Sequence, residues 1–438
     1  MMRITLRPFI PLFLAAWIAA CGNAGSAREE AAPDRPVADL NAVLTNEMSD
    51  TSVLKPMERK IQRYMSQWQL QGAQLAVMRN DSLLYAKGFG WADKEKVKPM
   101  KPGNIMRVAS VSKLVTATGI MVLQEQGRLS LKDTVFGPSG ILRDTAYCKS
   151  IKDKNYYKIT VEHLLRHQGG FTVRAGDPMF STPTIMKRNR LTKAPDNRQL
   201  LGLVLRRKLS FVPGTSQAYS NLGYMILSLV IEEVSGQDYE TFIRENVLDK
   251  AGCRNFRIAG NYYRDRHAGE VRYYVPSNEP RVPEFNNSGD SVVRCYGGNN
   301  ITALSGAGGW VASAPELALL VAAIDGRDGI RDIISAESVE EMTRYIDKET
   351  FSLGWNDTDP EKGWVRTGTL SGTNALIKYF PDGECWIFLS NTSTWKGPGL
   401  ARYTAALMSE LRRDFGRKIP ARDLFHDSVP ETAQKSTL

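Results

Sequence analysis

Residues Val111 to Gln126 predict a helix that is apolar on nearly all of its faces. The apolar positions do not form a single stripe, since they include Leu114, Val115, Ala117, Ile120, Met121 and Leu123. A helix without a polar face has to be buried in the centre of a domain. Gly127 follows directly and is typical of a helix C-terminus. The rest of the chain therefore has to supply elements that surround this helix.

Strand-forming sequences lie on both sides of that helix along the chain. The stretches 73–88 and 375–390 each hold two short extended runs around a turn-forming sequence, which predicts two hairpins. Amphipathic helices are predicted at 54–70 and 400–415, and the stretch from about 129 to 300 carries helices joined by long polar loops. This order predicts an α+β fold, an α/β sandwich in which the N- and C-terminal helices flank an antiparallel sheet and a mainly helical lobe is inserted.

The lobe boundaries follow from this layout. We expect the α/β lobe to comprise about residues 55–125 and 300–415, with the helical lobe at about 126–299 between them. Together they form a predicted domain at 51–425, and residues 426–438 are expected to be a tail.

The first twenty residues have the pattern of a targeting segment. Arg3 and Arg7 precede an apolar run from Pro8 to Ala20, which is shorter than the roughly 20 residues that span a bilayer and typical of a signal-peptide core. The run ends in Ala19-Ala20-Cys21-Gly22 and resembles the lipobox of bacterial lipoproteins, in which the cysteine is lipidated and becomes the first residue. We therefore expect a bacterial envelope protein, anchored in a lipid bilayer through Cys21 and facing the periplasm or the surface. Ordinary secretion with cleavage elsewhere is the alternative.

The residues after Cys21 have the composition of a linker. The stretch 21–50 has few large apolar side chains and is expected to be a tether between lipid and domain. Four further cysteines remain, at Cys148, Cys253, Cys295 and Cys385. Export makes disulfides chemically feasible, but the wide spacing favours buried free thiols at least as strongly.

Composition excludes several classes of function. The chain carries 57 Lys and Arg against 47 Asp and Glu, a formal net charge of +10, which we take to be spread over solvated faces. Because no Lys/Arg-dense run is interleaved with aromatic residues, we expect no nucleic-acid partner, although a weak attraction to anionic envelope surfaces is compatible with the charge. Four histidines and no C-x-x-C motif argue against a zinc site, and we expect neither metal nor cofactor.

The sequence S-x-x-K occurs three times, at Ser52, Ser110 and Ser393. Only Ser110 opens a long apolar helix directly after an extended segment, where a hydroxyl meets free backbone N–H groups and the positive end of the helix dipole. Lys113, three residues later on the same helix face, can reach that hydroxyl, and burial would lower its pKa toward that of a usable base. The alternative is that Ser110 only caps the helix and that Lys113 is a surface lysine.

Two further motifs carry groups suited to the same chemistry. In Tyr219-Ser220-Asn221 a phenol precedes an apolar helix, and next to an ammonium group its anion would be favoured, so that it could exchange protons. Asn221 could orient a substrate amide or hold the lysine. In Arg366-Thr367-Gly368-Thr369 the glycine would let a substrate backbone approach a strand, and the cation beside it suits a carboxylate. The alternatives are a helix cap, an edge-strand glycine and a solvated arginine.

Taken together, the three motifs resemble those of the serine β-lactamase and penicillin-binding-protein superfamily, in particular its class C β-lactamase-like branch, which also holds D,D-peptidases, D-aminopeptidases and esterases. The resemblance covers about residues 55–415 and includes Gly306 to Trp310 and the stretch 159–170, whose histidines we expect to support the structure. It implies that Ser110 is acylated, that Lys113 and Tyr219 share proton transfer and that Asn221 contacts the substrate. It further implies an oxyanion hole.

The N–H groups of Ser110 and Thr369 would form that hole, in which each donor stabilises the transition state by about 3–4 kcal/mol. One position departs from the family pattern, which usually has lysine or histidine where this chain has Arg366. Arginine binds an anion but does not act as a base, which weakens the case for efficient β-lactamase activity.

We therefore expect a serine hydrolase that forms an acyl-enzyme on an ester or on a D-amino-acid amide or peptide, with a small-molecule or peptide substrate. The alternative is a penicillin-binding or sensing lipoprotein that does not turn over. A purely structural lipoprotein would require all three motifs to be accidental.

Overall fold

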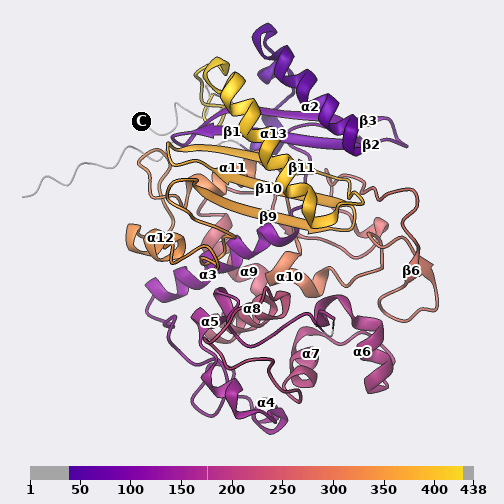
Figure 1. Cartoon of the computed structure of the whole chain (residues 1–438), viewed down its shortest axis with the longest axis vertical. Helices are drawn as coiled ribbons and strands as arrows, with labels where there is room; N and C mark the ends of the chain where they lie inside the picture. Colours follow the sequence, from indigo (N-terminus) through magenta and orange to yellow (C-terminus); the bar gives the residue numbers. More distant parts are fainter. Residues whose placement is uncertain (1–38, 175, 428–438) are drawn as a thin grey trace, which may run out of the picture. The chain divides into compact units, whose positions relative to one another are not determined.

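The computed structural model describes residues 39–174 and 176–427 (Figure 1). The predicted signal peptide, Cys21 and the end of the predicted tail lie outside these residues. A six-stranded antiparallel sheet has the order β3-β2-β1-β11-β10-β9. Its strands are β1 Gly72–Arg79, β2 Ser82–Asp93, β3 Lys98–Pro99, β9 Trp364–Leu370, β10 Thr373–Tyr379 and β11 Glu384–Ser390. Because β1 pairs with β11, sequences from the two ends of the domain share one sheet.

The first hairpin forms where the sequence predicts it. Asn80 and Asp81 connect β1 to β2 and both have a positive φ, of 45° and 59°. Asn and Asp tolerate this conformation better than most residues, and two such residues give a turn whose twist matches that of the strands.

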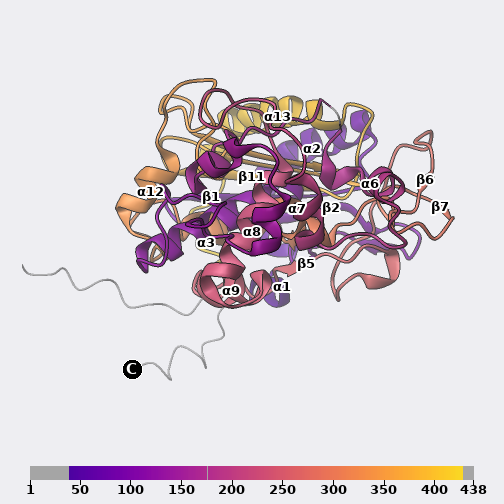
Figure 2. The same ribbon diagram turned by 90° about the horizontal axis from the view of Figure 1, so that it is seen from below.

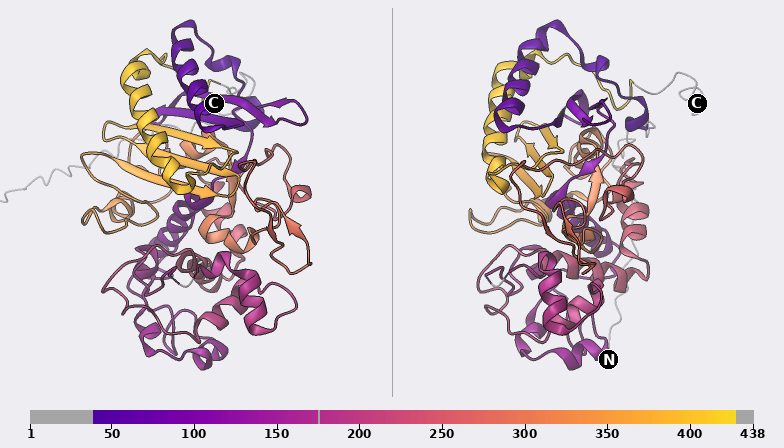
Figure 3. Two further views of the ribbon diagram at one scale, coloured as in Figure 1. Left: turned by 45° about the vertical axis from the view of Figure 1, so that its right-hand side comes forward. Right: turned by 90° about the vertical axis from the view of Figure 1, so that its right-hand side faces the viewer.

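Helices cover both faces of the sheet, as predicted. The helices α2 Lys55–Trp68 and α13 Leu400–Phe415 pack on one face, against side chains such as Leu75 and Val77. The alternate residues Ala76 and Met78 point to the other face, where α11 Ala314–Ala322 packs. This two-sided arrangement is visible in Figure 3, and it confirms the α+β class.

The buried helix α3 Ser112–Glu125 lies between the sheet and the helical lobe (Figure 1). Every residue from Ser112 to Leu123 is buried, as its apolar sequence requires. It begins one residue later than predicted, because Ala109–Val111 forms a 3₁₀ turn, η3, in front of it.

The inserted lobe is mainly helical. Its helices are α4 Thr145–Ser150, α5 Val161–Leu165, α6 Thr182–Asn189, α7 Asn197–Val204, α8 Asn221–Ser235 and α9 Tyr239–Ile243. A three-stranded sheet of β4 Met106–Arg107, β8 Trp310–Ala312 and β5 Arg257–Ile258 connects the lobes. The short hairpin of β6 Val282–Pro283 and β7 Ser291–Val292 stands at the right of Figure 2. The remaining helices are α1 Leu40–Val43, α10 Ser305–Gly308 and α12 Ala336–Thr343.

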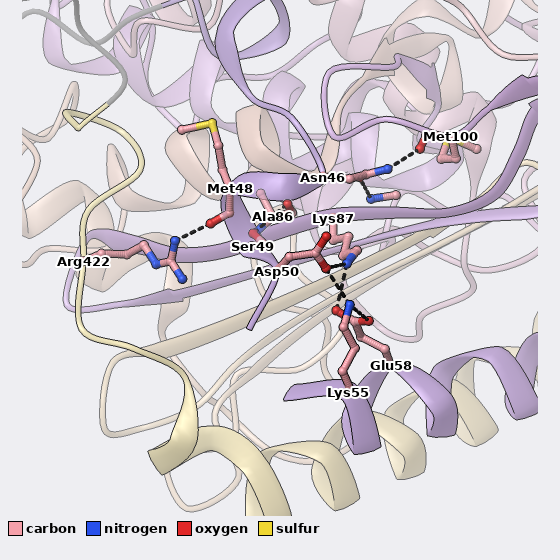
Figure 4. A network of polar contacts seen from close by, with 11 residues as sticks. Asn46, Met48, Ser49, Asp50, Lys55, Glu58, Ala86, Lys87, Met100 and Arg422 are labelled. Atoms are coloured by element: carbon pink, nitrogen blue, oxygen red, sulfur yellow. Dashed lines mark hydrogen bonds and ion pairs between the residues drawn. The ribbon is translucent and has the colours of Figure 1, made fainter. Parts of the chain in front are cut away.

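Residues 39–50 differ from the predicted tether, because they are packed against the domain. Leu40 is buried in the core, and the Asn46 side chain donates to the Met100 carbonyl and accepts the Gly88 N–H (Figure 4). Ser49 exchanges two hydrogen bonds with the Ala86 main chain. Polar side chains attach this segment through hydrogen bonds to backbone groups of the domain. Its polar composition therefore does not indicate that it is packed.

An ion-pair cluster continues this attachment. Lys87, on β2, is buried, and its ammonium group contacts both Asp50 and Glu58, the latter at 2.8 Å (Figure 4). Lys55 contacts the same two carboxylates, at 2.8 and 3.1 Å. Lys55, the lysine of the first S-x-x-K sequence, is therefore engaged in ion pairs.

Cys148 is half-buried, Cys253, Cys295 and Cys385 are buried, and all four thiols are free. In the part of the chain that the structure describes, no helix combines the length and the apolar character needed to cross a membrane. The same residues contain no group of three His, Cys, Asp or Glu side chains placed to hold a metal ion.

Candidate active site

Ser110 lies in the 3₁₀ turn between β4 and α3, where the turn holds its hydroxyl at the N-terminal end of the buried helix. The preceding residue, Ala109, has a φ of +48°, in the left-handed region that costs a residue with a side chain free energy. Such strain persists only where the surrounding packing enforces it, and here it sets the direction of the serine.

Lys113 is fully buried beside this hydroxyl. Its ammonium group donates to Ser110 Oγ at 3.2 Å, to Asn221 Oδ1 at 2.7 Å and to the Ala307 carbonyl at 2.5 Å. Burial lowers the pKa of Lys113 to about 8, with the Tyr219 phenol opposing the shift and the Arg366 charge adding to it. The predicted surface alternative for this lysine is therefore wrong.

Tyr219 approaches the same serine from the helical lobe. Its hydroxyl donates to Ser110 Oγ at 2.8 Å. Burial alone would raise the pKa of Tyr219, but the positive charges of Lys113 and Arg366 outweigh it and lower the pKa to about 8. Two titratable groups, each with a pKa of about 8, thus contact one hydroxyl.

His167 holds Tyr219 in place. The two rings pack with centroids 4.5 Å apart, His167 Nδ1 accepts the Ser220 N–H at 3.1 Å, and its carbonyl accepts the Ala218 N–H at 3.0 Å. Burial keeps the pKa of His167 far below its usual value, and the Lys113 charge adds to this. A neutral histidine is therefore a positioning residue here, which agrees with the supporting role expected for this stretch.

Asp177 adds a carboxylate to the site that the sequence analysis missed. Asn221 donates from Nδ2 to Asp177 Oδ2 at 2.7 Å, while its Oδ1 accepts from Lys113. The charge of Asp177 raises the pKa of Lys113 against the effect of burial. No motif marks Asp177, because it comes from a loop and is brought to the site by its contact with Asn221, which lies 44 positions away in the sequence.

Arg366 lies against the main chain of Ser110 and not in solvent. Its side chain is fully buried, and Nε and Nη2 donate to the main-chain carbonyl of Ser110 at 2.8 and 2.5 Å. Nη2 also contacts the Tyr219 hydroxyl at 3.3 Å. The solvated-arginine alternative is therefore wrong, and binding of a substrate carboxylate by Arg366 stays a prediction.

Gly368 lets strand β9 pass closely along the serine turn. A Cβ at this position would lie 2.2 Å from the Val108 carbonyl and 3.1 Å from Ser110 N. The sequence predicts that a substrate backbone approaches this glycine, whereas in the structure the neighbour is the protein's own chain.

Thr367 and Thr369 follow the free edge of β9. The Thr367 N–H and hydroxyl both donate to Asn356 Oδ1, at 2.7 and 3.1 Å, so this N–H points away from β10. Strand alternation gives the Thr369 N–H the same direction. A hollow of about 400 Å³ begins at Thr369, and Glu279, Arg294, Ser393 and Trp395 also line it.

The sequence and the structure of this chain are similar to those of known proteins. The family model described as Beta-lactamase matches residues 57–409. Penicillin-binding protein 4* of Bacillus subtilis strain 168 is 27% identical over 335 residues, which cover 74% of this chain and 68% of the relative. Protein flp of Staphylococcus aureus strain MW2 is 26% identical over 228 residues, which cover 52% of this chain and 43% of the relative.

Solved structures give the same result for the fold. The D-amino acid amidase of Ochrobactrum anthropi SV3, complexed with L-phenylalanine amide, superposes with a TM-score of 0.63 at 17% identity, over 83% of this chain and 99% of that one. EstCE1, a hydrolase with promiscuous acyltransferase activity, gives 0.62 at 20% identity, over 83% and 99%. These likenesses confirm the fold, and the family model confirms the resemblance drawn from the motifs. The chain belongs to the Beta-lactamase family and is a serine hydrolase of this superfamily.

Proposed function

We propose that the protein hydrolyses an ester, or an amide or peptide of a D-amino acid, through an acyl-enzyme on Ser110. One observation carries the proposal: the Ser110 hydroxyl lies 2.8 Å from the Tyr219 hydroxyl and 3.2 Å from the Lys113 amine. The names of the D-amino acid amidase and EstCE1 neighbours support these two substrate classes.

The hydrogen bonds of Lys113 favour Tyr219 as the base. All three ammonium protons have acceptors: Ser110, Asn221 and Ala307. A neutral amine would turn its lone pair toward one of these oxygens, at the cost of that hydrogen bond. When Lys113 and Tyr219 have together lost one proton near pH 8, Lys113 is therefore the protonated group and Tyr219 is a phenolate. This phenolate accepts the Ser110 proton.

In the proposed acylation step, the proton that Tyr219 takes from Ser110 is the one that it later gives to the leaving group. As Tyr219 takes the proton from Ser110, Oγ bonds to the carbonyl carbon of the substrate and the carbonyl oxygen becomes an oxyanion, for which the N–H groups of Ser110 and Thr369 are the proposed donors. The carbon–leaving group bond breaks as Tyr219 returns the proton to the leaving alcohol or amine. Water repeats the sequence on the acyl-enzyme, and the carboxylic acid leaves.

Arg366 contributes charge and position to this cycle. A guanidinium group does not release its proton, so it cannot share the transfer. It holds the Ser110 carbonyl and lowers the pKa values of both Lys113 and Tyr219. This keeps proton exchange near neutral pH.

Steady-state hydrolysis of a substrate panel tests the proposal. The panel comprises p-nitrophenyl acetate and butyrate, D- and L-alanine p-nitroanilide and a chromogenic cephalosporin. We expect turnover of an ester or of the D-anilide, lost in Ser110→Ala and retained in Ser393→Ala, whose serine also begins an S-x-x-K sequence. Turnover that survives in Ser110→Ala would contradict the proposal.

A second candidate is a penicillin-binding or sensing protein that is acylated without turnover. It is supported by Arg366, because the third motif then offers no base for deacylation. A stoichiometric penicillin adduct that lasts for hours, without steady-state hydrolysis of any panel member, would favour it.

We further propose that the mature protein is a lipoprotein of the bacterial envelope, anchored through Cys21. The sequence before and around this cysteine is the support for the anchor. Incorporation of radiolabelled palmitate by the full chain, and its loss in Cys21→Ser, would test it. Equal labelling of both chains would contradict it.

A further inference from the structure

The net charge of the protein is confined to one segment of the chain. Residues 143–208 hold 15 Lys and Arg and 5 Asp and Glu, whereas the rest of the chain has 42 of each kind. The full formal charge of +10 thus comes from this segment, in contrast to the even spread expected from the composition.

The structure brings part of this charge together at the tip of the helical lobe, around α4 and α7 (Figure 1). Lys193, Arg198 and Arg206 line one hollow of about 610 Å³ with residues of α4. The Lys152 N–H donates to the Leu205 carbonyl at 3.3 Å, which places Lys152 beside Arg206. Lys149 lies in the last turn of α4.

These five residues, Lys149, Lys152, Lys193, Arg198 and Arg206, are called the basic face below, and all of them are exposed. Within the described residues, Arg198 pairs with Glu232 at 3.1 Å, and no carboxylate lies within ion-pair distance of the other four. Asp144 is the one acidic residue that lines the hollow. Like charges that gather on one face repel one another and destabilise the folded state, unless an anionic partner covers them.

We propose that the basic face docks the protein on a phospholipid surface that carries phosphate headgroups of net negative charge. Lysines are point charges that attract such headgroups without fixed geometry. The charge excess extends beyond the hollow to Lys187 and Arg188 at the end of α6, so the surface is wider than a small phosphorylated ligand would require.

Other polyanions fit the face less well. Proteins that bind single-stranded nucleic acid stack bases on exposed aromatic rings, whereas Tyr147, the aromatic residue of the hollow, is 8% exposed. The remainder of the chain has a formal net charge of zero. The electric field of this segment therefore orients the tip of the helical lobe toward a negative surface, and the remainder of the chain adds no net charge that opposes it. The proposal does not depend on the Cys21 anchor.

Vesicle co-sedimentation tests this docking. The chain from Pro36 onward, which holds every described element, is incubated with phosphatidylcholine vesicles containing one quarter phosphatidylglycerol, and with pure phosphatidylcholine vesicles. The test variant combines K149Q, K152Q, K193Q and R206Q. The matched control combines K94Q, K96Q, K98Q and K101Q, which remove four exposed charges around the β2–β3 turn.

We expect the protein to bind the anionic vesicles, not the neutral ones, and to be released at 0.5 M salt. Since each Lys or Arg near such a surface strengthens binding by about fivefold, the test variant should bind at least about a hundredfold more weakly. The control should stay within about fivefold, and both should keep the wild-type ester hydrolysis.

Three results would overturn the proposal. The first is equal binding to both vesicle types, and the second is equal loss in the test variant and the control. The third is binding of a soluble polyanion such as heparin or polyphosphate, with no binding to anionic vesicles, which would assign the face to a polymer.

Discussion

Replacing Tyr219 by Phe removes one hydroxyl and leaves the ring in place. The ring still packs against His167, at 4.5 Å, and against Phe351, at 5.9 Å, so the loop keeps its position. The lost group is the one that lies 2.8 Å from Ser110 Oγ. General acid–base catalysis contributes about 10²- to 10⁴-fold to a rate, and we expect kcat/KM for the best substrate to fall by that factor.

Stability should change far less. The hydroxyl makes hydrogen bonds to Ser110 and to Arg366, and Arg366 keeps its two bonds to the Ser110 carbonyl. The loss of two buried hydrogen bonds costs about 2 kcal/mol, which corresponds to a fall in Tm of a few degrees in a domain of this size. Thermal unfolding and the rate of labelling by a fluorophosphonate measure the two effects separately.

Tyr224→Phe is the matched control. Tyr224 is buried, packs on His167 at 5.2 Å, and donates its hydroxyl to the Leu165 carbonyl at 2.9 Å. It makes no contact with Ser110, so its loss should cost stability with less than about a threefold change in rate. The reasoning would be refuted if Tyr219→Phe kept more than a third of the wild-type kcat/KM, or if both variants lost activity equally.

Three further outcomes follow from the charges and packing. Asp177→Asn removes a carboxylate that raises the pKa of Lys113, so the falling limb of kcat/KM, where Lys113 loses its proton, should move to lower pH. A falling limb that does not move would show that this carboxylate does not act on Lys113. Gly368→Ala would place a Cβ 3.1 Å from Ser110 N, and we expect a loss of about 1–3 kcal/mol in stability together with at least tenfold slower labelling, whereas wild-type labelling would show that the strand can shift freely. Burial raises the pKa of Asp325 to about 8, so folding binds an extra proton between about pH 4 and 8. Wild-type stability therefore falls as the pH rises through this range, and Asp325→Asn should gain Tm relative to wild type from pH 5 to pH 8. A Tm difference that stays constant over this range would contradict the raised pKa.

Elements with a strong local signal could be predicted from the sequence. The buried helix α3 has no polar face, the first hairpin has two residues suited to positive φ, and α13 spans the predicted 400–415. Context also singled out Ser110, because the other two S-x-x-K sequences do not open a buried helix. In each case residues close in sequence decide the outcome.

Contacts between distant residues could not be predicted in this way. Asp177 reaches the site through a hydrogen bond from Asn221, and His167 does so through two hydrogen bonds and its ring contact with Tyr219. The burial of Arg366 depends on a carbonyl 256 positions away in the sequence. Residues 39–50 look like a linker, because their attachment uses polar side chains such as Asn46 that bind backbone groups.

The mass of the intact protein after reaction with a fluorophosphonate, and separately with benzylpenicillin, tests the acyl-enzyme most directly. Wild type and Ser393→Ala should gain one adduct, carried by the peptide that contains Ser110, and Ser110→Ala should gain none. An adduct on another residue, or no adduct on wild type with either reagent, would contradict the account.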